Sequence, residues 1–539
     1  MDHLEALVVG RIATFAGDAG YGWIEAIGIA GGRVVASGRL AEVEASAGPR
    51  TRRIDLEPGE VAFPALTDGH VHLIDTAMAA DAIDLFQAAT LEDALDMVVS
   101  AAARIPAPGW IQGSGWDQRR WHRWPTAADL DRAAPGRRVA LRSFDLHALW
   151  ASAAALDGAG ITARTPDPPG GIVHRGLDGT PDGILFENAT NVVMATVPPS
   201  SPDTIRRTLR SIARAFLALG VVGVHEFGTL APDPGNASLD LYTAAAEAGE
   251  MPIRIWAGIR ADALEDAVGR GLQSGAALSP IGTDRLTVGW YKLFADGTLG
   301  SRTAALLEPG EGTSEHGIFT NPAAWLEERT SRAAAAGITT AIHAIGDAAV
   351  RTALDVLAPT AASSAFMPRI EHVQLCHPDD RSRFGRHGIA ASVQPIHLRE
   401  DAQGARVDWG SRAESAGYTW RSLLDAGATV AFGTDAPLEP LDPWPGIAMS
   451  VLRRDPTWAA DDPDFGSHEA ITLEGALRAS TVGPWQLLRD QLGGRLVPGS
   501  HADVVVLPAM PDDDLLRGAD FGRIRPRLVM VGGDVEFER

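Results

Sequence analysis

Two histidines separated by one residue, His70 and His72, are the first residues in the sequence whose spacing indicates chemistry. They follow an apolar run that predicts a β-strand, and residues two apart on an extended chain face the same side. Both imidazoles can therefore reach one metal ion. Taken alone the pair is a weak indication, because a His-x-His also arises by chance in a chain of 539 residues.

Four further side chains have the same kind of position as this pair, near the end of a predicted strand. Each lies within or just beyond the end of a different apolar strand; they are Lys292, His343, His372 and Asp435. Any one of them has an ordinary explanation, since strand histidines are often satisfied core residues and a terminal aspartate often caps a helix. Together they would place six polar or charged groups in one apolar interior, which is costly without a shared partner. A divalent cation is such a partner.

Lys292 is the least expected ligand, because an ammonium group repels a cation. An ion pair with Asp296 is the alternative role for its side chain. Burial lowers the pKa of a lysine, and a neutral amine can react with carbon dioxide to give a carbamate whose two oxygens bridge two ions. On this interpretation the site is binuclear.

The elements that must position these residues alternate between short apolar strands and helical segments rich in alanine and leucine. This alternation is typical of βα units and a parallel sheet. Eight strand candidates are present, the number that closes a (β/α)8 TIM barrel with its active site at the carboxyl ends of the strands. The candidates cover residues 61–68, 221–227, 253–257, 286–294, 338–343, 369–375, 389–394 and 429–433.

Both ends of the chain have a different sequence pattern, with short apolar runs separated by glycine-rich turns. We expect residues 1–60 and 495–539 to form a composite β-sandwich domain. Residues 61–74 and 206–494 are expected to form the barrel. The long interval between the first two barrel strands predicts an inserted α/β cap domain over residues 75–205.

Composition excludes several classes of protein. Apolar residues make up 45% and charged residues 22% of the chain, the mix of a globular protein with a large core. The net charge of −22 disfavours nucleic acid and anionic membrane surfaces as partners. The single cysteine, Cys376, excludes an internal disulfide and a thiolate zinc site. With an acidic N-terminus and no apolar run of roughly 18 residues, we predict a cytoplasmic protein.

The residues described above resemble the amidohydrolase superfamily, specifically the amidohydrolase-3 or YtcJ-like group that includes N-substituted formamide deformylases. Two departures from the family pattern are Pro64-Ala65, where the family usually has Pro-Gly, and the second strand, Gly223-Val224-His225-Glu226. The resemblance rests on Asp68-Gly69-His70-Val71-His72, on residues 292–302, on His343-Ala344-Ile345-Gly346-Asp347, on Glu371-His372-Val373-Gln374 and on Gly433-Thr434-Asp435-Ala436-Pro437.

The resemblance implies a ligand set. His70, His72 and Asp435 are expected on one ion, His343 and His372 on the other, with carboxylated Lys292 between them. Two Zn²⁺ ions and carbon dioxide are therefore the expected cofactors. Imidazole and carboxylate also suit Mn²⁺, Fe²⁺ and Ni²⁺, so the sequence leaves the metal open.

The expected reaction is hydrolysis of a non-peptide C–N bond in a small amide, formamide or carbamate-like substrate by a metal-bound hydroxide. Asp435 is the expected catalytic residue, taking the proton of the hydroxide and passing it to the leaving nitrogen. The residues we expect to bind substrate are Trp116, His225, Arg302 and His397.

Two alternatives remain. Deaminases of heterocyclic amines share the barrel and the His-x-His, but they use one metal and a glutamate three residues after the strand-five histidine, where this chain has Gly346. A barrel that binds without catalysis is the other alternative, although such proteins usually lose ligands. The sequence also leaves the oligomeric state open, with a homodimer as one option.

Overall fold

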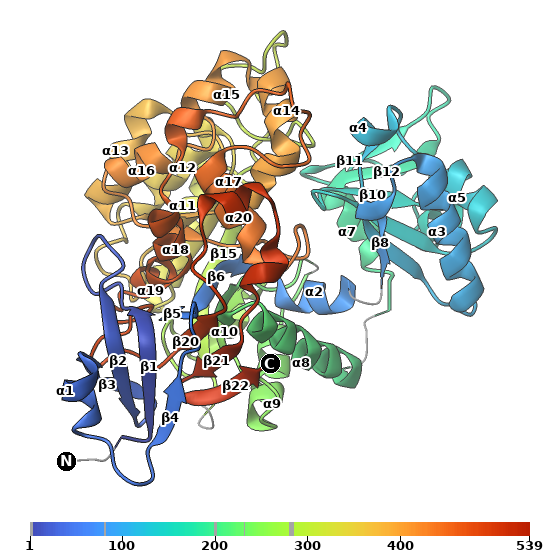
Figure 1. Cartoon of the computed structure of the whole chain (residues 1–539). Helices are drawn as coiled ribbons and strands as arrows, with labels where there is room; N and C mark the ends of the chain where they lie inside the picture. Colours follow the sequence, from blue (N-terminus) through green and yellow to red (C-terminus); the bar gives the residue numbers. More distant parts are fainter. Residues whose placement is uncertain (1–3, 80–81, 199–201, 231, 280–284) are drawn as a thin grey trace.

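The computed structural model describes residues 4–79, 82–198, 202–230, 232–279 and 285–539. The chain folds into a barrel, a cap and a β domain built from both chain ends, here named the terminal β domain. The cap lies beside the barrel as a separate lobe, and the terminal β domain lies on the opposite side of the barrel (Figure 1).

Eight parallel strands form the barrel, as predicted. Neighbouring strands pair in the order of the chain, and the last strand lies beside the first, where the amide of Asp435 donates to the carbonyl of His70 at 2.8 Å. The strands are buried along nearly their whole length because helices cover the outside and side chains fill the inside. They are β6 (Leu66–Val71), β13 (Val221–Glu226), β14 (Arg254–Ile259), β15 (Leu286–Phe294), β16 (Thr340–Ala344), β17 (Arg369–His372), β18 (Ala390–Val393) and β19 (Val430–Phe432).

The first predicted strand, residues 61–68, is two strands in the structure. β5 (Val61–Pro64) pairs with a strand of the terminal β domain, and β6 begins after Ala65 and pairs with β13. Both strands are buried throughout, and Ala65 and Leu66 continue the apolar run of β5, so the sequence pattern alone does not reveal the change of sheet. The barrel therefore begins at β6.

Helices follow the barrel strands and pack their apolar faces on them. In α8 (Pro202–Ala218), for example, Leu209, Ala213 and Phe216 are buried in the barrel core at helical spacing. The principal other helices are α9 (Ala237–Glu247), α10 (Leu264–Gly269), α11 (Ala323–Ala335), α12 (Asp347–Leu357), α13 (Pro378–His387), α14 (Leu398–Trp409), α17 (Pro443–Leu452) and α18 (Leu473–Ser480).

The cap has its own sheet and its own hydrophobic core. Its principal helix, α3 (Leu91–Arg104), starts with a capping box in which Thr90 and Asp93 bond each other's backbone. The short helix α2 (Leu73–Ala79) belongs instead to the barrel, because Leu73 and Ile74 lie in the barrel core. The cap strands are β7 (Ile83–Asp84), β8 (Ile111–Trp116), β9 (Val139–Ser143), β10 (Ala148–Ala151), β11 (Gly171–Arg175) and β12 (Pro181–Glu187).

The terminal β domain joins strands from both ends of the chain in one sheet that branches at its first strand, which pairs with both the fourth and the fifth. None of the helices that the structure describes has the length and hydropathy to span a membrane. The strands of the domain are β1 (Ala6–Ala13), β2 (Trp23–Ala30), β3 (Arg33–Gly38), β4 (Arg52–Asp55), β5, β20 (Val504–Leu507), β21 (Leu528–Val531) and β22 (Asp534–Glu538).

Candidate metal centre

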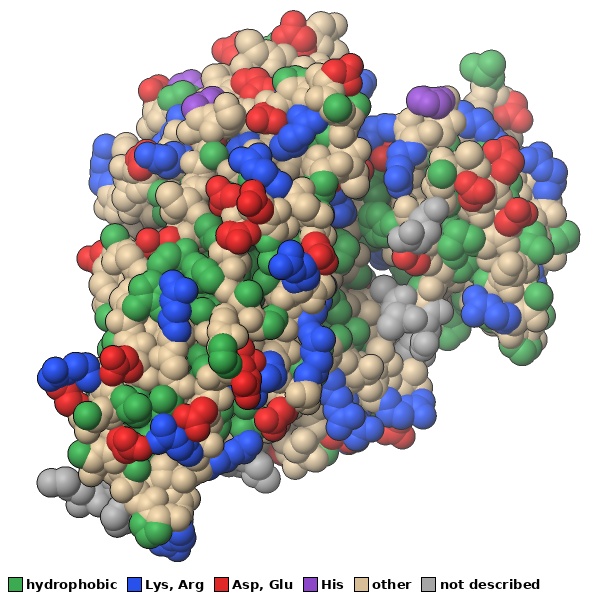
Figure 2. All heavy atoms as spheres, in the orientation of Figure 1, with side chains coloured by type: hydrophobic (Ala, Val, Ile, Leu, Met, Phe, Trp, Pro, Cys, Tyr) green, Lys and Arg blue, Asp and Glu red, His purple; other side chains and the backbone are tan. Residues whose placement is uncertain are grey.

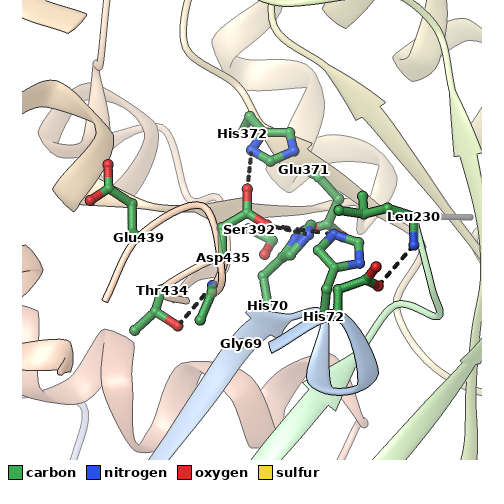
Figure 3. A network of polar contacts seen from close by, with 12 residues as sticks. Gly69, His70, His72, Leu230, Glu371, His372, Ser392, Thr434, Asp435 and Glu439 are labelled. Atoms are coloured by element: carbon green, nitrogen blue, oxygen red, sulfur yellow. Dashed lines mark hydrogen bonds and ion pairs between the residues drawn. The ribbon is translucent and has the colours of Figure 1, made fainter. Parts of the chain in front are cut away.

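The structure brings the six predicted ligands together at the carboxyl edge of the barrel. Parallel strands end on one face, so residues distant in sequence meet there. Figure 3 shows the rings of His70, His72 and His372 gathered around the carboxylate of Asp435. One oxygen of Asp435 lies 3.4 Å from Nε2 of His70 and 3.5 Å from Nε2 of His72, and the other lies 3.8 Å from Nδ1 of His372.

Several of these atoms are buried without a partner. Nε2 of His70, Nδ1 of His372 and Oδ1 of Asp435 have no hydrogen bond to any residue that the structure describes. Burial holds the pKa values of His70 and His372 well below the ordinary histidine value, so both rings are neutral and carry a free lone pair. Neutral imidazoles and a carboxylate, left unsatisfied in a buried space, fit a divalent cation.

The outward nitrogens of the His-x-His pair are fixed by bonds on the other side of each ring. Nδ1 of His70 lies 2.6 Å from the carboxylate of Glu371, and Nδ1 of His72 lies 2.8 Å from the carbonyl of Gly228. Both partners can only accept, so Nδ1 carries the proton in each ring. Nε2 is then free to bind a metal in both histidines, as second-sphere bonds of this kind usually ensure.

Glu371 is held in turn by a buried arginine. Nε of Arg369 lies 2.6 Å from Oε1 of Glu371, and other nitrogens of the same guanidinium donate to the carbonyl of Gly69 and to Nδ1 of His225. His225 is therefore committed to Arg369 and packs against Trp290, away from the substrate cavity described below. This position differs from the substrate-binding role expected for His225.

Lys292 is buried in the same cluster. Burial lowers its pKa to about 8, although the nearby carboxylates of Glu371 and Asp435 act in the opposite direction. The expected alternative partner, Asp296, accepts instead from the backbone amides of Ala305, Ile345 and Gly346. In the described part of the chain, no ion pair joins Lys292 to Asp296.

Lys292 is also the only lysine of the chain, and the other residues counted with it as basic are all arginine. This is a feature of the sequence that the pattern of strands and motifs does not show. Arginine stays charged at every accessible pH, whereas a buried lysine can lose its proton. The only lysine of the chain is thus buried beside the proposed metal ligands.

His343 lies beside His372 on the second side of the cluster. Their ring centroids are 4.5 Å apart, and Nε2 of His343 lies 3.1 Å from the carbonyl of Gly297. That bond places the proton on Nε2 and leaves Nδ1 free. The cluster thus offers nitrogen donors for a second ion next to the first.

His397 lies next to Asp435. Its Nε2 is 3.2 Å from Oδ2 of Asp435 and its Nδ1 is 3.5 Å from Glu439. Burial lowers the pKa of His397, but the two carboxylates outweigh it and raise the pKa to about 10. Burial raises the pKa of Asp435, but its interactions with His70, His397 and His72 outweigh burial and hold the pKa at about 2. His397, expected to bind substrate, lines the cavity described below.

A cavity of about 430 Å³ opens above the cluster between barrel and cap. His147 of the cap reaches into it, bonded to Glu187 at 2.8 Å, with its ring 5.9 Å from that of His343. The cap is joined to the barrel loop after β15, since Asp145 accepts from Thr298 at 3.0 Å and Glu187 also accepts from this loop. On the face seen in Figure 2, a hollow separates the two domains.

Two other residues expected at the substrate lie elsewhere. Trp116 is buried in the cap core, where its Nε1 donates to the carbonyl of Leu141. Arg302 is largely exposed and pairs with Asp408 at 3.1 Å. Neither lines the cavity. Their positions differ from the expectation because sequence spacing does not indicate which way an isolated side chain points.

Comparison with known proteins agrees with this geometry. The profile of the amidohydrolase family matches residues 52–536. YtcJ of Bacillus subtilis (strain 168) is 28% identical over 520 residues, 96% of each chain. An N-substituted formamide deformylase of Arthrobacter pascens is 29% identical over 541 residues, 96% of this chain and 95% of the relative. The crystal structure of an uncharacterized metal-dependent hydrolase from Pyrococcus furiosus has a TM-score of 0.72 at 26% identity, over 94% of this chain and 99% of that one. The chain belongs to the amidohydrolase family of metal-dependent hydrolases.

Proposed function

We propose that the protein hydrolyses a non-peptide C–N bond of a small amide, formamide or carbamate-like molecule, using two divalent cations, with Zn²⁺ the expected ion. The observation that supports this most directly is the set of unpartnered, buried donor atoms of His70, His372 and Asp435 beside the only lysine. A relative of similar length is named for its action on N-substituted formamides.

In this proposal His70, His72 and Asp435 hold one ion, and His343 and His372 hold the other. Lys292, as its carbamate, would supply an anionic ligand shared by the two ions, and formation of the carbamate requires a neutral amine. With a pKa of about 8, roughly a tenth of Lys292 is neutral at pH 7, against well under 1% for an ordinary lysine. Burial thus prepares the amine for reaction with carbon dioxide.

The overall reaction consumes one water: a C–O bond forms at the substrate carbonyl, the C–N bond breaks, and an amine leaves. Bound divalent cations supply a lowered pKa for water and polarisation of the carbonyl. Asp435 and His397, with 3.2 Å between Oδ2 and Nε2, share a proton at the cavity wall. This pair is placed to deliver that proton to the leaving nitrogen, which departs more readily as a neutral amine.

The deaminase alternative is less compatible with the local structure. It needs a glutamate side chain three residues after His343, at Gly346. A Cβ at Gly346 would overlap the carbonyl oxygen of Ala305, so this position has no room for a side chain. The binding-protein alternative has no support from the cluster, in which all six proposed ligands meet.

The test compares metal content per chain in the parent, Lys292→Ala and Lys292→Arg, purified without chelator. Arginine keeps the positive charge but cannot form a carbamate, so it is the matched control for loss of charge. We expect about two ions in the parent and one or none in both variants. Parent protein prepared in ¹³C-bicarbonate should also give a single carbamate resonance, because the chain has one lysine.

Activity is then screened on N-substituted formamides, amides and carbamates. Hydrolysis by the parent, its loss after chelation and its return with metal would support the proposal. One ion in all three proteins would exclude the bridging role of Lys292. Absence of metal from the parent would overturn a metal-dependent mechanism.

A further inference from the structure

Two arginines from different domains line the same side of the cavity. Arg142 comes from β9 of the cap and Arg260 follows β14 of the barrel. Arg260 donates to the carbonyl of Thr229 and pairs with Asp262 at 3.1 Å. The loop that contains Thr229 also bonds His72, through the carbonyl of Gly228. The two arginines therefore lie on the His72 side of the cavity.

Arg142 has little that balances its charge. One of its nitrogens donates to the carbonyl of Leu146 at 3.3 Å, and it forms no ion pair with any described residue. Burial lowers the pKa of Arg142, Asp75 raises it, and the nearby Arg260 lowers it again. A second cation therefore acts on a guanidinium that is already poorly solvated.

The acids that share the cavity with Arg142 are already bonded elsewhere. Asp145 accepts from the hydroxyls of Thr298 and Ser301, and Glu187 accepts from His147 and Thr303. A half-buried cation without a paired anion loses part of its hydration, and a bound anion offsets that cost.

We infer that Arg142 and Arg260 form a subsite for a carboxylate carried by the substrate, so that the preferred substrates are N-acylated or N-formylated amino acids. This inference rests on the proposed function, since it assumes that the amide of the same molecule lies at the metal cluster. Guanidinium groups bind carboxylates through two parallel hydrogen bonds, which gives both affinity and orientation. Because one arginine belongs to each domain, the substrate carboxylate would join cap to barrel.

The test uses two substrates that differ only in the carboxylate, N-formylphenylalanine and N-formylphenethylamine, with the metal-loaded full chain. The measured quantity is the ratio of their kcat/KM values. We expect the parent to favour N-formylphenylalanine by about tenfold or more, the usual effect of a charge-assisted pair. Arg142→Gln should lower this ratio by about tenfold or more, and Arg142→Lys should give an intermediate ratio.

Arg120→Gln is the matched control, because Arg120 is an exposed cap arginine that, among the described residues, bonds only the carbonyl of Phe86 and does not line the cavity. It should keep the parent ratio. Thermal unfolding of each variant, and the charge-conserving Arg142→Lys, separate loss of the subsite from loss of the fold.

The outcomes separate this inference from the proposed function. Hydrolysis of both substrates with equal kcat/KM, or an unchanged ratio in Arg142→Gln, would overturn the carboxylate subsite and leave amide hydrolysis intact. If neither substrate is hydrolysed, calorimetric titration with N-formylphenylalanine decides. Binding to the parent that Arg142→Gln abolishes supports the subsite without the proposed reaction, and absence of binding to the parent overturns it.

Discussion

His372 and Asp435, two of the proposed ligands, have backbone φ angles of 75° and 61°. Residues other than glycine rarely adopt this left-handed conformation, and it costs free energy that the surrounding structure must supply. Each residue lies directly at or just after the end of a barrel strand, where the chain leaves the sheet. The strained backbone turns both side chains toward the cluster, which is typical of functional sites.

Glu371 orients His70, so its replacement should weaken metal binding without removing a ligand. In Glu371→Gln the bond to Nδ1 of His70 and the pair with Arg369 are weakened. We expect a loss of metal affinity of about 10- to 100-fold, as for other second-sphere changes. Competition with a chromogenic chelator measures this affinity.

Glu439→Gln is the control, since Glu439 contacts His397 and Arg399 but none of the six proposed ligands. It should retain the parent affinity for metal. Equal metal affinities in Glu371→Gln and the parent would show that Glu371 does not strengthen metal binding.

At the scale of single residues, the sequence predicted the proposed ligands near the ends of strands. It missed the residues that orient these ligands and the cap residue that lines the cavity. The six proposed ligands were identified because each lies within or just beyond the end of an apolar run. Glu371, Arg369 and Arg142 gave no such indication, because their roles depend on partners from other strands or from the cap. Spacing along the chain contains no information about those contacts.

At the scale of elements, the closure of the barrel between β6 and β19 determines whether the cluster exists. Asp68 accepts from the amides of His70 and Thr434, both at 3.0 Å, and so connects the ends of the two strands. Asp435 follows immediately. The geometry of half the cluster therefore depends on how closely these two strands approach.

Gly433 permits this approach. A Cβ at this position would lie 2.7 Å from Cβ of His70 and closer still to its backbone nitrogen. We expect Gly433→Ala to push β6 and β19 apart, to destabilise the barrel by about 1–3 kcal/mol and to reduce bound metal. Urea unfolding and metal content measure the two effects.

Gly269→Ala is the matched substitution, because no atom lies within 4 Å of the added Cβ and the residue ends a helix. It should leave both quantities close to those of the parent. If Gly433→Ala also left stability and bound metal close to those of the parent, the close approach of the two strands would not control the site.

The eight barrel strands were predictable because parallel strands buried on both faces are continuous apolar runs. The predicted boundary was wrong where one apolar run continues from β5 into the start of β6, because the run does not show where the chain changes sheet. The expected start of the cap at residue 75 falls inside α2, whose Ala77 lies in the barrel core. An amphipathic helix does not reveal from its sequence which core it joins.

At the scale of the whole molecule, a buried ion pair connects the barrel to the terminal β domain. Nε of Arg254, in β14, lies 2.9 Å from Asp503, which precedes β20 and also accepts from the amide of Gly532. Burial raises the pKa of Asp503, but Arg254 outweighs it and holds the pKa below the ordinary aspartate value. The carboxylate thus stabilises the folded state when it is charged.

Asp503→Asn should destabilise the protein at pH 7 by about 3–5 kcal/mol, because it removes the charge of one partner of a buried ion pair. A carboxyl with a lowered folded-state pKa contributes stability above its unfolded pKa and loses it as the pH falls through the folded value. The difference in the free energy of unfolding between parent and variant should therefore become smaller below about pH 4. Urea unfolding midpoints at pH 7 and pH 3.5 measure it.

Asp534→Asn is the control on the same sheet, since Asp534 is 81% exposed and its contact with Arg285 is 3.8 Å. Exposed pairs of this kind contribute little. A difference between parent and Asp503→Asn that did not change with pH would contradict the assignment of the stability to a charged Asp503.

All six proposed ligands come from the barrel, while the cap supplies only walls of the cavity, among them Arg142, His147 and Glu187. The residues proposed for the reaction therefore lie in the barrel, whereas the cap contributes only to the proposed choice of substrate, together with barrel residues such as Arg260. The cap can diverge, or be exchanged for another, without disturbing the ions. A lineage built on this plan can acquire new substrates while inheriting its chemistry unchanged, and residues 82–198 are where such divergence should be sought.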